Sequence, residues 1–168
     1  ITSILASASE QGATEAPRLD GFIGPAHVSA VIGYRPFEAF VRDHGRPVVI
    51  AGFEPLDVMQ AILMLVRQLN DGRCEVENEY TRVVTRDGNV KAQALMADVF
   101  ELRDSFEWRG LGWLDRSALK IRDSYATFDA EKRFVLKTAA IADNKACECG
   151  AVLRGISEPV ECKLFATV

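Results

Sequence analysis

The run PVVIAG at Pro47 to Gly52 is the sequence feature that most limits what this chain can fold into. Its apolar and β-branched side chains occupy consecutive positions instead of alternate ones. A strand of this kind has both faces buried, as in a parallel sheet that is covered by helices. Glu54, Pro55 and Asp57 follow at once, and proline and acidic side chains are typical of the first turn of a helix. The sequence therefore predicts a buried parallel strand followed by a long helix.

An earlier stretch repeats this order of elements. Leu19 to Gly24 is predicted to be a short buried strand, and Pro25 suits the start of the helix that follows. Apolar residues between Phe37 and Val41 then indicate a helix that ends at Gly45. Strand, helix, strand and helix in succession predict an α/β fold with right-handed crossovers and a Rossmann-like parallel sheet.

The middle of the chain is predicted to be helical. Val58 to Leu69 is apolar around most of a helix circumference, so we expect that helix to be covered on more than one side. Glu75 to Arg86 and Asn89 to Arg103 are predicted as two further helices, separated by a turn at Asp87 and Gly88.

Smaller elements surround this middle part. Ile1 to Ala16 is predicted to be a truncated helix, and Trp113 to Ile121 a strand or hairpin that follows a glycine-containing turn. Asp129 to Arg133 has the composition of a solvated turn. The chain has 168 residues, of which 48% are hydrophobic, enough for one sizeable core. We expect an α/β domain portion over residues 1–138 and a cysteine-rich segment over residues 139–168, with Ala139 to Asn144 as the linker.

Polar side chains follow both predicted parallel strands at the point where each strand ends. His27 comes just after the first strand, and Glu54 and Asp57 come just after the second. Ligands of parallel sheets bind beyond the carboxyl ends of the strands, so His27 and Glu54 are candidate catalytic residues that face one cleft. Because Glu54 precedes proline, its side chain is expected to point away from the helix, whereas Asp57 is expected to serve the helix start. The alternative is that both acidic residues only cap the helix and that His27 only satisfies a backbone group.

Three of the four cysteines lie close together near the end of the chain, at Cys147, Cys149 and Cys162. Thiolates select zinc, copper(I) or iron-sulfur clusters, and the single residue between the first two is a tighter spacing than structural zinc sites use. A disulfide across that spacing would close a strained ring. The alternative is that the three thiols bind no metal. Cys74 has no ligand-like neighbour in the sequence.

Charge and hydropathy exclude several classes of function. The net charge is −4, and no cluster of Lys and Arg is available to bind phosphate, so we expect no nucleic-acid partner. No apolar run approaches the roughly 20 residues that a membrane span needs. No signal peptide is recognisable, so we expect a cytoplasmic protein with reduced thiols.

Several motifs resemble the HypD family of NiFe-hydrogenase maturation proteins, in the family's order. They are FIGPAHVSAVIG at 22–33, AGFEPLD at 51–57, VENEYTRVV at 76–84, EWRGLG at 107–112 and the tail motif CxCGxVLRG with PxECxLF from Cys147 onward. The resemblance covers nearly the whole chain from Leu19. Ala26 departs from it, since the family usually has glycine there. The family's amino-terminal CGGH, GPGCPVC and GFETT motifs have no counterpart, so we interpret the chain as a piece of a longer protein.

The resemblance implies an assembly scaffold and redox maturation factor, not a stand-alone turnover enzyme. Such a protein holds an iron ion while cyanide and carbon monoxide ligands are installed, together with a HypC-type chaperone and a HypE-type cyanide donor. It also implies a [4Fe-4S] cluster on Cys147, Cys149, Cys162 and a further cysteine seven residues later, one position past Val168. We therefore expect an absent or incomplete cluster in this chain, with the tail held by packing of its apolar side chains, which are Val152, Leu153, Ile156, Leu164 and Phe165.

Two functions of other classes remain open from the residues alone. His27, Glu54 and Asp57 could hold a divalent metal in a hydrolase, although no recognisable catalytic motif accompanies them. The three clustered cysteines could instead stabilise an interaction module by binding zinc. Metal content separates these hypotheses.

Overall fold

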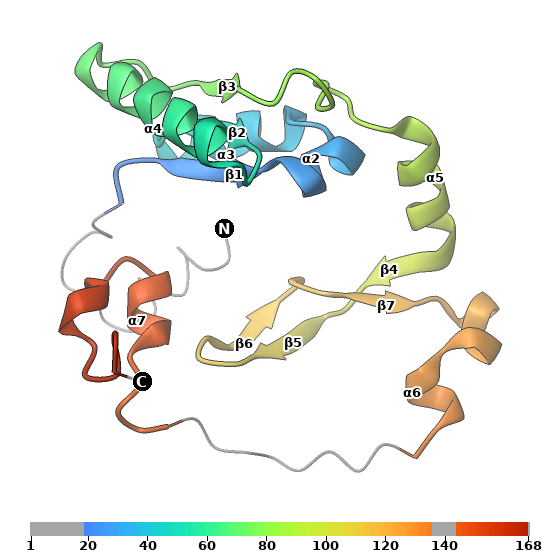
Figure 1. Ribbon diagram of the computed structural model, residues 1–168. Coiled ribbons are helices and arrows are strands. Elements are labelled where there is room, and N and C mark those ends of the chain that lie inside the picture. The colour runs from blue at the N-terminus through green and yellow to red at the C-terminus, as the bar shows by residue number, and fades with distance from the viewer. Residues whose placement is uncertain (1–18, 136–143, 168) are drawn as a thin grey trace. The chain divides into compact units, whose positions relative to one another are not determined.

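A computed structural model describes residues 19–135 and 144–167 of the chain (Figure 1). The chain divides into two compact units, one formed by Leu19–Met96 and one that includes Ala97–Val168, and each is described by itself. The predicted helix at Ile1 to Ala16, most of the linker at Ala139 to Asn144 and the predicted boundary after residue 138 lie outside the described residues.

The first unit is built on a three-stranded parallel sheet. Its strands are β1 (Phe22–Pro25), β2 (Val48–Ala51) and β3 (Val76–Asn78), in the order β1-β2-β3. Phe22 pairs with Val48 in one register and Val48 with Val76 in the next. All four residues of β2 are buried, which confirms the parallel, two-sided burial predicted for PVVIAG.

Helices cover the two faces of β2. Val49 and Ala51 form the core with Ala61 of α4 (Pro55–Asn70). On the opposite face, Val48 and Ile50 lie near Gly24, beside the ring of Phe37 in α3 (Arg35–His44). The remaining helix, α2 (Ala26–Ile32), follows β1 directly. Alternate side chains of one strand therefore supply both layers of the core, and the mixed α/β architecture agrees with the predicted fold class.

The expectation that α4 is covered on more than one side is wrong within the described residues. Ala61 is fully buried on the sheet side. The outward side carries exposed apolar side chains, namely Leu56, Met59, Ile62, Leu63, Val66 and Leu69. The reason is that a single sheet face contacts only one stripe of a helix, and no second layer lies over α4 within its unit.

The predicted helix at Glu75 to Arg86 is also wrong. Val76–Asn78 is strand β3, and the following residues form turns. Gln68, which is fully buried on α4, fixes this strand through two hydrogen bonds: its Nε2 donates to Glu77 at 2.8 Å, and its Oε1 accepts from the backbone N–H of Glu75 at 2.9 Å. Pairing with the edge of β2 and the hydrogen bonds from buried Gln68 stabilise the extended conformation, so tertiary context overrides local propensity.

The second unit is mostly antiparallel. Strands β4 (Phe100–Leu102) and β7 (Leu119–Ile121) pair, and β5 (Ser105–Trp108) and β6 (Gly112–Asp115) form a hairpin. The helix predicted at Asn89 to Arg103 is shorter than expected, because α5 (Val90–Val99) gives way to β4.

Short helices complete this unit. They are η1 (Asp123–Phe128), α6 (Ala130–Arg133), α7 (Cys149–Leu153) and η2 (Pro159–Glu161). The predicted solvated turn at Asp129 to Arg133 is instead the start of α6, where the Asp129 side chain accepts from the backbone N–H of Glu131 at 2.9 Å. Asp129 is accordingly buried as a helix cap.

Candidate functional site

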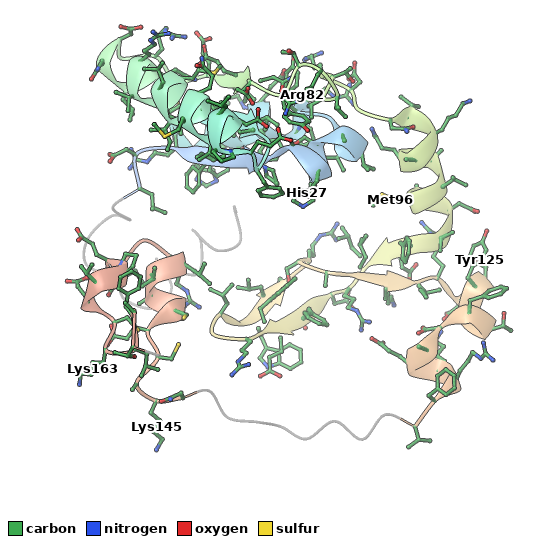
Figure 2. All side chains as sticks on the ribbon, viewed as in Figure 1. His27, Arg82, Met96, Tyr125, Lys145 and Lys163 are labelled. Carbon is green, nitrogen blue, oxygen red and sulfur yellow. The ribbon has the colours of Figure 1, made fainter. Side chains whose placement is uncertain are left out.

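The carboxyl ends of the three parallel strands carry the candidate residues of the first unit. His27 is in the first turn of α2 after β1, Glu54 precedes α4 after β2, and Arg82 follows β3. Figure 2 shows the labelled His27 and Arg82 at the same end of the sheet, close to the start of α4. This end is where α/β sheets bind ligands.

Arg82 joins the two carboxylates that follow β2. Its guanidinium contacts both oxygens of Asp57, with Nη1 donating to Oδ1 at 3.1 Å and Nη2 to Oδ2 at 2.7 Å. The same Nη2 donates to Oε2 of Glu54 at 2.5 Å. The guanidinium also lies 3.6 Å from the centre of the Tyr80 ring. A planar donor fork that meets a carboxylate in this way fixes direction as well as charge.

Gly52 leaves the space that this arrangement needs. A Cβ atom at this position would overlap Oδ2 of Asp57 and the edge of the Tyr80 ring. The glycine therefore lets the end of β2 approach the carboxylate and the aromatic ring closely.

Glu54 and Asp57 differ in exposure, and only the outward direction of Glu54 was predicted from its place before proline. Glu54 has extended backbone angles before Pro55 and makes no side-chain cap hydrogen bond. Its side chain is 68% exposed, whereas that of Asp57 is 9% exposed. The Asp57 carboxylate is thus a buried partner of Arg82, and Glu54 extends toward solvent.

The site holds carboxyl groups in opposite electrostatic situations. Hydrogen bonding from Arg82 lowers the pKa of Asp57 below its ordinary value. Burial raises the pKa of Glu79, and the negative charge of Asp57 adds to that effect. Oε2 of Glu79 is buried without a hydrogen-bond partner in the described structure. Because Arg82 already occupies the Asp57 carboxylate, a hydrolase metal bound there would have to displace a guanidinium.

His27 is exposed and lies against an aromatic neighbour. Its ring centre is 5.1 Å from that of Phe53, with the planes tilted by 34°. Phe53 is itself 77% exposed and directly precedes Glu54. An exposed neutral imidazole offers one nitrogen lone pair to an incoming metal or substrate and one N–H donor.

Sequence reasoning missed Glu79, Tyr80 and Arg82 as members of this edge. The signal was available, because VEN in the block VENEYTRVV could have been interpreted as a third strand, which would place these residues at its carboxyl end. The helix prediction for that block concealed their position.

The second unit brings the three clustered cysteines to one cavity. A cavity of about 390 Å³ is lined by Cys147, Cys149 and Cys162, together with the apolar side chains of Val152, Leu153, Pro159, Leu164 and Phe165. Sγ of Cys147 lies 3.1 Å from Sγ of Cys149, too far for a disulfide bond. None of the four cysteines forms a disulfide bond within the described residues, and Cys74 is exposed after α4.

The three thiols are ligands of the type that zinc, copper(I) and iron-sulfur centres use. The neighbouring thiols raise the pKa of Cys149, chiefly Cys147, with which it shares a hydrogen bond, and burial adds to the effect. A bound cation would relieve this by favouring thiolates. Among the described residues, however, no group of three or more His, Cys, Asp or Glu side chains is already arranged to hold a metal ion. Three thiols thus share a cavity without converging on one point.

The tail is not held in the way that its apolar residues suggested. Leu153, Leu164 and Phe165 are 54%, 40% and 54% exposed. Arg154 is instead 4% exposed, and its Nη2 donates to the carbonyl oxygen of Leu111 in the β5–β6 turn at 2.6 Å. The expected apolar packing is therefore wrong for these side chains, because the described part of the chain covers them only in part.

No helix in the described part of the chain is long and apolar enough to cross a membrane.

Comparison with known proteins gives a consistent family. A family model described as HypD, the hydrogenase formation hypA family, matches residues 2–168. A hydrogenase maturation factor HypD of Cupriavidus necator is 66% identical over 168 residues, which are 100% of this chain and 44% of that protein. One from Rhizobium leguminosarum is 65% identical over 151 residues (90% of this chain, 39% of the relative), and one from Escherichia coli is 43% identical over 147 residues (88% and 39%). The chain spans about two fifths of the length of these relatives.

Proposed function

The chain belongs to the HypD family of hydrogenase formation proteins, and from this membership we propose that it is part of a scaffold on which the Fe(CN)₂CO moiety of a NiFe-hydrogenase is assembled. Relatives that match nearly the whole chain are named hydrogenase maturation factors, which supports a maturation role. The observation that carries the finer proposal is that Cys147, Cys149 and Cys162 line one largely apolar cavity.

In this proposal the three cysteines are ligands of a [4Fe-4S] cluster. A cluster bound there would supply electrons to the maturation reaction. The apolar side chains around the thiols, including Val152 and Leu164, would limit the access of water to them. Cysteines that are not joined by disulfides are consistent with a reducing compartment such as the cytoplasm.

The edge of the parallel sheet is the proposed place of the residues that act on the iron that is being assembled, with iron as cargo. His27, with an exposed imidazole, and Glu54, with a carboxylate that extends toward solvent, are the proposed catalytic residues. Arg82 would keep Asp57 ionised and would hold Glu54 near the end of β2. A HypC-type chaperone and a HypE-type cyanide donor are the proposed partners at this edge.

The cysteine proposal is tested by anaerobic reconstitution with iron and sulfide, with charge-transfer absorbance and iron and sulfide content as readouts. The 168-residue chain, which offers three thiols, is expected to form little stable cluster. A chain extended by a cysteine one position past Val168 should form a four-iron cluster, because such a cluster takes four thiolates.

Single substitutions in the extended chain identify the ligands. Cys147→Ala, Cys149→Ala and Cys162→Ala should each abolish the cluster, and Cys74→Ala should retain it as the matched control. Zinc retained in place of iron would favour the zinc-stabilised module, and a stable four-iron cluster in the 168-residue chain would show that the ligand set is wrong.

The maturation role is tested in a chimera. This chain would replace the matching segment of the Cupriavidus necator relative, in cells that lack their own HypD, with hydrogenase activity as the readout. We expect the chimera to restore activity, His27→Ala and Glu54→Ala to remove most of it, and Glu75→Ala, an exposed carboxylate before β3, to leave it intact. Unchanged activity in both site variants would refute the assignment of the sheet edge.

A further inference from the structure

Arg154 is buried in a segment whose other long side chains are largely exposed. It is 4% exposed, and it follows directly on α7, the helix that begins with Cys149. A guanidinium can be buried only when its N–H groups are hydrogen-bonded, since burying an unpaired charge is strongly unfavourable. Nη1 donates to the carbonyl oxygen of Gly150 at 3.0 Å, and Nη2 donates to that of Leu111 at 2.6 Å. One side chain therefore connects α7 to the turn between β5 and β6.

The backbones of these two elements also touch. A Cβ atom added to Gly150 would overlap the carbonyl oxygen of Gly110. Gly110 and Gly112 have φ values of 75° and 76°, which only glycine adopts readily, and they shape the turn that meets α7. The close approach to Gly110 thus explains Gly150, and the positive φ values explain the two glycines of WRGLG.

This contact decides the direction of two thiols. At five residues, α7 is too short to be stable by itself, so packing must fix it. A second cavity, of about 870 Å³, lies between the β5–β6 turn and α7 and is lined by Arg109, Leu111 and Arg154 among others. Cys147, Cys149 and Leu164 line both this cavity and the one that Cys162 lines. A displacement of α7 would therefore move Cys149, and with it the adjoining Cys147, relative to Cys162.

We propose that Arg154 is a positioning residue, which fixes the cysteine helix on the β5–β6 turn so that Cys147 and Cys149 face the cavity that Cys162 also lines. Its effect on a bound metal rests on the proposed function. The docking of α7 on the turn does not, because it follows from contacts within this chain.

Amide hydrogen exchange tests the docking. Arg154→Met keeps the aliphatic stem and removes the donors, and loss of hydrogen bonds to a charged group should raise the opening equilibrium by about tenfold or more. Exchange should become faster in α7 and in the turn at residues 109–111 together. Arg103→Met is the matched control, because Arg103 lies in the same unit and contacts the carbonyl oxygen of Leu119, the Glu131 carboxylate and the Phe106 ring instead of the tail. Faster exchange in α7 with an unchanged turn would overturn the proposed docking.

Gly150→Ala tests the same contact without changing a charge. Alanine in a helix is ordinarily more stable than glycine, so an undocked α7 should be stabilised by this substitution. A docked α7 should instead be displaced by the overlap with Gly110, and exchange in the turn should rise. Slower exchange in both elements would contradict the proposal.

Titration with Co²⁺ alone, followed by thiolate-to-metal charge-transfer absorbance, tests the positioning of the thiols. We expect Arg154→Met to weaken Co²⁺ binding by about tenfold, Arg154→Lys to restore part of the loss, and Arg103→Met to have no effect. Equal affinity in Arg154→Met and the unsubstituted protein would overturn the positioning role. If the unsubstituted protein binds no Co²⁺ while the exchange results hold, the proposed metal function fails and the docking stands.

Discussion

Arg82 is the residue on which the electrostatics of the sheet edge depends. It lies within hydrogen-bond distance of Asp57 and Glu54 and stacks on Tyr80, while its side chain remains 47% exposed. One cation thus balances two carboxylates that come from the same loop and helix start. Because it follows a different strand, it also joins the ends of β2 and β3.

At this scale the first prediction separates the two carboxylates. Asp57→Ala should lower the melting temperature clearly more than Glu54→Ala, because Asp57 is buried against both terminal guanidinium nitrogens of Arg82 and Glu54 is mostly exposed. Thermal unfolding followed by circular dichroism measures both variants. Equal losses would mean that the exposed Glu54 carboxylate contributes as much to stability as the buried Asp57 carboxylate.

The second prediction concerns pH. Because Arg82 lowers the folded-state pKa of Asp57, the stability from this ionised carboxylate is fully present above about pH 4 and is lost as the pH falls through the lowered pKa. Arg82→Met should therefore be less stable than the unsubstituted protein at pH 7, and the difference should shrink as the pH falls below about 4. Urea unfolding at a series of pH values measures this difference.

Arg82→Met has to be compared with the unsubstituted protein at each pH, because Glu79 also affects the pH dependence of stability. Its pKa is raised, whereas that of Asp57 is lowered. Arg42→Met is the control, since Arg42 pairs with Asp43 where both side chains are exposed. This control should change stability little at any pH. A difference for Arg82→Met that stays constant down to acid pH would argue against the Asp57 pair as its source.

At the scale of elements, β2 and α4 show how one buried strand can organise a unit while its covering helix stays half open. Every residue of β2 is at most 1% exposed, and its alternate side chains pack on helices of both faces. The outward stripe of α4 remains apolar and accessible, with Leu56 at 83% exposure. An apolar side chain therefore contributes much to stability in β2 and little on the outward side of α4.

This contrast gives the third prediction. Ile50→Ala should destabilise the protein by about 2–5 kcal/mol, because it leaves a cavity in the core between β2 and α3. Leu56→Ala should change stability by no more than about 0.5 kcal/mol, because its side chain is mostly exposed. Both values come from urea unfolding at pH 7. A large loss in Leu56→Ala would show that the outward stripe of α4 is covered in solution.

At the scale of the whole molecule, two units carry two different kinds of site. The unit Leu19–Met96 presents His27, Glu54 and Arg82 at the edge of a parallel sheet, and the unit that includes Ala97–Val168 presents three thiols around one cavity. Hard oxygen and imidazole donors are thus in one unit and soft sulfur donors are in the other.

The amino-acid sequence by itself determined the buried strand at PVVIAG, the start of α4 at Pro55 and the clustering of the cysteines. Consecutive β-branched residues, a proline at a helix start and thiol spacing are local signals that act over a few positions. The ordered motifs also pointed to the HypD family, which the family match confirms.

Only the tertiary structure decided what depends on residues far apart in the chain. Val76–Asn78 became a strand because β2 offered it a hydrogen-bonding edge, and Arg82 reached Asp57 because β3 ends beside β2. The partner of Arg154 lies 43 residues earlier, at Leu111. Local pattern cannot reveal such contacts. A buried charge or an extended segment is stabilised by a partner far away in the chain, and the residues next to it do not indicate where that partner lies.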